Sequence, residues 1–179
     1  MNTRNLLTTL FLLACVAQEA AALVRMGAGN VEVHARGPAG LRITGKSTEV
    51  SLVEDSSVLL FKAAIAPLDT GIGLRNRHLR EALEADRFPE ATLSVKRADL
   101  RFPGDGTSVE GETQGELTLH GQSHPVAVRY RAERKDDLTH IAGSLRLDLR
   151  DFAVVTPSYL GVAVSPEVEV DLDLAVEGL

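Results

Sequence analysis

The chain has 179 residues, a formal net charge of −6 and a single cysteine, Cys15. This length is enough for one domain of ordinary size. The acidic balance and the absence of basic runs with interleaved aromatic residues argue against nucleic-acid binding. One cysteine excludes an internal disulfide, so the core must hold by packing alone.

Residues 1–22 predict a signal peptide. Arg4 supplies a small positive region, residues 6–16 are almost entirely apolar but too short to span a bilayer, and three alanines at 20–22 suit a signal peptidase. We therefore expect export to the periplasm or secretion, with a mature domain of residues 23–179. An alternative is that Leu-Leu-Ala-Cys at 12–15 is a lipoprotein box, which would leave Cys15 as a lipidated N-terminus.

One segment of the mature chain has a helical period. Leu79 and Leu83 are four residues apart, and His78 and Ala82 are predicted on the same side, because spacings of three and four put side chains on one helix face. Phe88-Pro89 ends the pattern, since proline disfavours helical geometry in the residue before it. The sequence therefore predicts one short helix near residues 75–86, as a plug, lid or end cap.

Most other segments alternate between apolar and polar residues, the period of half-buried strands. The last is the clearest, with apolar residues at 168, 170, 172, 174 and 176 between acidic ones. Residues 92–102 change phase, which predicts a strand with a bulge near Lys96 and Arg97. Gly111 and Gly115 fall on the apolar side of their strand, where a barrel wall can bend.

Hairpin turns between such strands predict an all-β fold, an antiparallel sheet of about eight strands with one dry face. It would close into an extended barrel or fold into a sandwich. The interior of an eight-stranded barrel is either filled by side chains or holds one small ligand. The inward residues are mostly small and aliphatic, and both outcomes stay open on pattern alone.

Three segments in order resemble the YceI family of exported, lipocalin-like lipid-binding proteins. The first runs from Asp-Thr-Gly at 69–71 through Arg-Asn-Arg-His-Leu-Arg at 75–80 to Arg-Phe-Pro at 87–89. The second is Gly-Glu-Leu-Thr-Leu-His-Gly-Gln-Ser-His-Pro-Val at 115–126. The third is Leu-Arg-Asp-Phe-Ala-Val at 149–154, followed by the last strand from 164. The likeness covers nearly the whole mature chain from about residue 30.

The resemblance implies a barrel around an elongated pocket that holds a long isoprenoid chain, such as a polyprenyl lipid or the tail of a quinone. It implies an exported carrier or reservoir with no other cofactor. The expected pocket residues are Phe61, Ala63, Ile65, Thr70, Arg75, His78, Leu79, Leu117, Val128, Leu147, Phe152 and Leu172. Four departures from the family pattern are Asn76 for Asp, Leu149 for Arg, Ala153 for Gly, and a shortened first strand at 29–33.

Two polar groups near the helix have alternative interpretations. His78 either donates to a ligand headgroup at the pocket mouth or holds the helix on the barrel. The arginines at 75, 77, 80 and 87 either bind a phosphate or form a solvated face paired with Glu81 and Glu84, which would contribute only a few tenths of a kcal/mol per pair.

No catalytic motif is present, and we do not expect an enzyme. His120 and His124 flank a turn but lack the further ligands that a metal site needs. The alternatives to a lipid carrier are a ligand-free structural or stress-response module and, third, an enzyme acting on a lipid-like substrate. A hydrophobic small molecule is the expected partner; peripheral membrane association and a dimer both remain open.

Overall fold

The computed structural model describes residues 23–25, 29–156, 158–159, 162–177 and 179. The predicted signal peptide and the alternative lipoprotein cysteine lie outside these residues. The strands are β1 (Leu23–Arg25), β2 (Gly29–Arg36), β3 (Arg42–Ser47), β4 (Val50–Asp55), β5 (Val58–Ala64), β6 (Glu90–Lys96), β7 (Ser108–Leu119), β8 (Gln122–Lys135), β9 (Leu138–Asp148), β10 (Ser158–Tyr159), β11 (Val162–Ala163) and β12 (Glu167–Glu177). The helical elements are α1 (Gly73–Ala82) and two 3₁₀ turns, η1 (Pro38–Gly40) and η2 (Arg97–Asp99).

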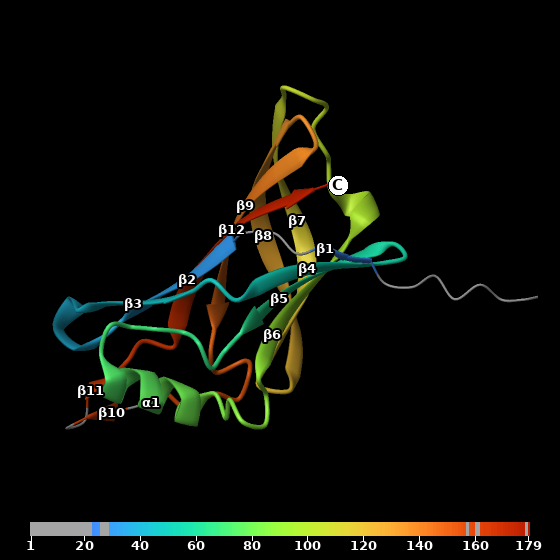
Figure 1. Ribbon diagram of the computed structural model, residues 1–179. Helices are drawn as coiled ribbons and strands as arrows, with labels where there is room; N and C mark the ends of the chain where they lie inside the picture. The colour runs from blue at the N-terminus through green and yellow to red at the C-terminus, as the bar shows by residue number, and fades with distance from the viewer. Residues whose placement is uncertain (1–22, 26–28, 157, 160–161, 178) are drawn as a thin grey trace, which may run out of the picture.

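Ten strands form one antiparallel sheet in the order β1-β4-β5-β6-β7-β8-β9-β12-β2-β3, and β10 pairs with β11 separately. The sheet curls around a common interior, and α1 lies across its lower end (Figure 1). This confirms the all-β fold with one helix, with ten strands in the main sheet where about eight were expected. The two edge strands, β1 and β3, are not paired with each other in the described chain, so the barrel is open along one side.

The register of β12 confirms the predicted alternation. Val168 is opposite Leu147 of β9 and Ala35 of β2, and Leu172 is opposite Gly143 and Val31. Leu174 and Val176, farther along the same face, are fully buried. The acidic residues between them face outward, so the sheet has one dry face and one wet face.

The dry face is filled by two apolar clusters. The helix-end cluster has a core of Ile65, Ala85, Leu117, Leu119, Val126, Val128, Phe152 and Val154. The far-end cluster has a core of Leu52, Leu59, Ala132, Ile141, Leu174, Val176 and Leu179. Leu79 and Leu83 pack against the first cluster, and this contact holds the helical segment over the end of the barrel.

The predicted helix is present with a different end, and one predicted strand was wrong. The helix ends at Ala82, short of residue 86, because Glu84 has a φ of 45° and leaves the helical conformation. The segment 92–102 is not one bulged strand: β6 ends at Lys96 and η2 follows. Leu100 and Phe102 nevertheless pack against the far-end cluster, because the loop after η2 folds back over the interior.

Candidate functional site

A cavity of about 60 Å³ lies inside the curled sheet, between the two clusters. Most of its wall is aliphatic or aromatic. The lining residues are Leu59, Phe61, Leu93, Val95, Leu100, Arg101, Phe102, Thr113, Val128, Tyr130, Ala132, Ile141, Gly143, Ser144, Leu145, Val170 and Leu172. Such a wall suits an apolar guest, because concave apolar surface with few polar groups is typical of small-molecule sites.

One side of the cavity is formed by a loop and not by a strand. Leu100 and Phe102 lie on the segment between η2 and β7. The Arg97 guanidinium lies 4.5 Å from the centre of the Phe102 ring, and the backbone N–H of Arg101 donates to the Tyr130 hydroxyl at 2.9 Å. These side chains belong to no strand ladder, and loops are in general more mobile than the strands they connect.

The three inward glycines near the cavity differ in the space around them. A Cβ at Gly111 would come within 2.9 Å of the Tyr130 hydroxyl, and one at Gly115 within 2.7 Å of Leu93. A Cβ at Gly143 would meet only the Arg129 carbonyl, at 3.8 Å. Gly143 is therefore the position where a side chain can grow into the cavity.

The predicted pocket residues fall into four groups. Phe61, Val128 and Leu172 are in the cavity wall. Five others belong to the helix-end cluster: the buried Ile65, Leu117 and Phe152, and Leu79 and Leu147 packed against them. Ala63 is half-buried on β5. Thr70, Arg75 and His78 lie outside the cavity, at the start of α1 and on it.

A polar network fixes the start of α1. The Asn76 carboxamide oxygen accepts from the Thr70 backbone N–H at 2.8 Å and from its hydroxyl at 2.6 Å. Its amide nitrogen donates to Asp69 at 2.7 Å, and the Gly71 N–H donates to the same carboxylate at 2.8 Å. The hydrogen bond from Asn76, followed by that from Gly71, lowers the pKa of Asp69. Thr70 therefore helps to position α1.

Other polar residues of the helical segment are more exposed. His78 is exposed, and its side chain makes no hydrogen bond within the described chain. Arg80 is half-buried and donates to the Ala66 carbonyl at 3.4 Å. Arg77 lies 3.9 Å from Glu81, as the spacing predicted. Glu84, however, contacts Arg87 at 3.4 Å and His120 at 3.1 Å, and not Arg80 as expected, because its positive φ turns it away from the helix.

His120 is a structural residue whose role the sequence did not indicate. One ring nitrogen lies 3.0 Å from the Phe152 carbonyl oxygen and the other 3.1 Å from the Glu84 carboxylate. The ring also contacts Phe88 edge-on, with the centroids 5.0 Å apart. The β7–β8 turn is thereby joined to the end of the helical segment and to the loop that carries Phe152. Its only sequence signal was the His-Gly turn.

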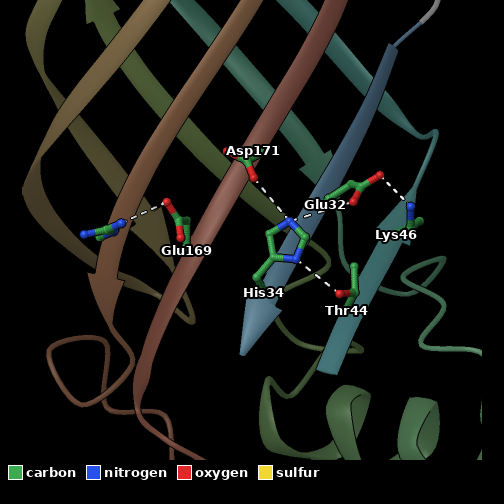
Figure 2. A network of polar contacts seen from close by, with 7 residues as sticks. Glu32, His34, Thr44, Lys46, Glu169 and Asp171 are labelled. Atoms are coloured by element: carbon green, nitrogen blue, oxygen red, sulfur yellow. Dashed lines mark hydrogen bonds and ion pairs between the residues drawn. The ribbon is translucent and has the colours of Figure 1, made fainter. Parts of the chain in front are cut away.

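The outer face carries a separate polar network on β12, β2 and β3 (Figure 2). The His34 ring lies 3.1 Å from the Thr44 hydroxyl and 3.2 Å from Asp171, and Lys46 lies 2.6 Å from Glu32. These contacts give polar side chains on the wet face hydrogen-bond and ion-pair partners. Among the described residues no group of three or more His, Cys, Asp or Glu side chains is arranged to hold a metal ion. In that same part of the chain, no helix has the length and apolar character to cross a membrane.

The sequence matches the YceI-like domain over residues 25–176. The chain belongs to the YceI family. A UPF0312 protein of Vibrio cholerae serotype O1 is 30% identical over 118 residues, which are 63% of this chain and 57% of that protein. The chain thus matches little more than half the length of this curated relative.

Solved structures share the YceI fold at low sequence identity. A polyisoprenoid binding domain from Saccharophagus degradans, implicated in plant cell wall breakdown, superposes with a TM-score of 0.72 at 16% identity. It covers 88% of this chain and 99% of that one. BcnA from Burkholderia cenocepacia superposes with a TM-score of 0.66 at 18% identity, over 83% and 96% of the two chains. These likenesses confirm the fold that the sequence predicted.

Proposed function

We propose that this YceI-family protein binds one long isoprenoid chain, such as a polyprenyl lipid or the tail of a quinone, inside its barrel. The observation that supports this proposal is the apolar cavity between two apolar clusters. A guest there would extend along the barrel axis, with the far-end cluster at one end and the helix-end cluster at the other. The polyisoprenoid-binding domain with the same fold supports this class of ligand.

The cavity must enlarge to hold such a chain. A volume of about 60 Å³ suits a few water molecules and is far too small for about twenty carbons. The loop side chains of Leu100 and Phe102 are the natural part of the wall to withdraw, because they are not held in a ladder. We propose that the ligand takes their place, so that the apolar contacts these side chains make with the interior are replaced by contacts with the ligand.

The binding energy should come from the tail. Each buried methylene contributes roughly 0.8 kcal/mol, so each added methylene should tighten binding about fourfold until the interior is full. The test is a titration with polyprenyl alcohols of increasing length. Replacing Arg75 or His78 with Ala should weaken binding by about tenfold or less, because neither side chain reaches the cavity. An affinity that ignores chain length and collapses with the arginine change would contradict a tail-driven pocket.

The ligand-free module remains the second candidate, and the small size of the cavity is the observation that favours it. Lipid retained by the purified protein separates the two. We propose a carrier or reservoir and not an enzyme; turnover of a bound lipid by the purified protein would contradict this.

We further propose that the protein is exported. N-terminal sequencing from the native host should place the mature start near Leu23. An acylated Cys15 would establish the lipoprotein alternative, and an intact Met1 would contradict export.

A further inference from the structure

Strands β8 and β9 pair over only part of their length. Their ladder runs from Lys135 opposite Leu138 to Val128 opposite Leu145. Beyond that point β8 is paired only with β7, and β9 only with β12. The unpaired edges are residues 122–127 of β8 and 146–148 of β9. We call the space between these edges the slot.

A groove of about 1070 Å³ lies over the slot. Its lining includes residues 124–127 on one edge and 146–148 on the other, together with residues of β2, β3 and β12 and the loop residues Asp151, Phe152 and Ser165. Val126 and Leu147 belong to the dry face of the sheet, whereas the exposed Ala127 and Arg146 belong to the wet face. The slot is thus a stretch where the two neighbouring strands share no ladder and where a surface groove reaches Val126 and Leu147 of the dry face.

The slot leads directly to the cavity. Val128 and Leu145, the last pair of the ladder, both line the cavity. Val126 and Leu147 are the next residues on the same face of each strand, and both line the groove. The residues that line the cavity and those that line the groove are therefore only two positions apart on each strand.

Phe152 lies beside the β8 edge of the slot. Its side chain is 1% exposed, belongs to the helix-end cluster and also lines the groove. The ring contacts His124 of β8 edge-on, with the centroids 5.2 Å apart. Its backbone carbonyl oxygen lies 3.0 Å from the His120 ring. Phe152 sits in a short turn after β9, closed by the hydrogen bond from the Val154 N–H to the Leu149 carbonyl at 3.0 Å.

We propose that the isoprenoid chain enters and leaves the barrel sideways through the slot between β8 and β9, with Phe152 as the plug. This inference rests on the proposed function and adds the route by which the ligand enters and leaves. It places the entrance away from Arg75 and His78, where the sequence had suggested a pocket mouth. Displacing one aromatic side chain and its turn joins the groove to the interior, whereas a route through the ladder would break strand pairing.

Matched cross-links test the route. Ala127→Cys with Arg146→Cys bridges the slot, at positions that would be opposite each other if the ladder continued. Arg131→Cys with Ala142→Cys bridges the paired part of the same two strands. All four positions are exposed, and each arginine has one ion pair across the wet face to a neighbouring strand, Arg146 to Glu169 and Arg131 to Glu110. Both pairs are made in the full chain with Cys15→Ser and closed with the same short bis-maleimide.

The measurement is the rate at which fluorescently labelled geranylgeraniol, loaded before cross-linking, is released to unlabelled lipid. The slot cross-link should slow release by about tenfold or more, with the ladder cross-link leaving it unchanged. Phe152→Ala, if folded, should speed release. Equal release rates from both cross-linked proteins would show that the lipid does not leave through the slot, but would not contradict the proposed function. Failure of the unmodified protein to bind the probe would overturn the proposed function itself.

Discussion

A larger side chain in the cavity wall should stabilise the protein and weaken ligand binding at the same time. Gly143→Val adds three carbons at a position where a Cβ has an open approach, 3.8 Å from its nearest neighbour. Burying them contributes about 0.8 kcal/mol each, and removing a strand glycine adds roughly 0.5–1 kcal/mol. After side-chain ordering, we expect the free energy of unfolding to rise by about 1–3 kcal/mol.

The same three carbons occupy space that the ligand needs. Binding of geranylgeraniol should therefore weaken by about 2 kcal/mol, or about thirtyfold. The assays are urea unfolding without ligand and fluorescence titration with it. Ala142→Val is the matched control, because Ala142 is the exposed neighbour on the wet face of β9; it should change neither quantity. A stabilised Gly143→Val protein that binds with wild-type affinity would show that the chain does not occupy this cavity.

Three further predictions test the register and the helix anchor. Leu172→Asp should unfold the domain, because an unpaired buried charge costs several kcal/mol, whereas Asp171→Glu on the wet face should leave the urea midpoint unchanged; equal effects would contradict the register. Asn76→Asp should lower the thermal midpoint at pH 7, since it replaces the donor to Asp69 with a second carboxylate, and an unchanged midpoint would argue against the network. The lowered pKa of Asp69 means that its stabilisation is present above the unfolded-chain pKa of about 3.9 and is lost as pH falls through the folded pKa. Asp69→Asn should therefore flatten the acid limb of the stability curve, and an acid limb like that of the wild type would contradict this.

The periodic segments could be predicted because burial of one sheet face imposes a period of two. Residues 168–176 are the clearest case: the predicted inward side contains Leu174 and Val176, both fully buried. Gly111 and Gly115 were also placed on the correct face. What each glycine accommodates could not be predicted, because Gly115 and Gly143 differ only in the residues that neighbouring strands bring near them.

The remaining differences depend on contacts between distant segments. Residues 97–102 keep an apolar pattern because Leu100 and Phe102 pack, partly buried, against the far-end cluster. They do so from a loop, which the pattern alone does not distinguish from a strand. The end of the β8–β9 ladder at Val128 and Leu145 does not interrupt the alternation of either segment. Pro125, which cannot donate a ladder hydrogen bond, is a local signal of an edge there. Likewise, His120 meets partners 32 and 36 positions away in the chain, a spacing that no local motif encodes.

Native mass spectrometry of the protein purified from its own host tests the central claim most directly. We expect one bound lipid per chain, released as an isoprenoid on collisional activation, and we expect Gly143→Val to retain much less of it than Ala142→Val. A purified protein that shows only its bare mass, and that also fails to take up geranylgeraniol when it is offered, would contradict the lipid-binding account and establish a packed barrel without a ligand.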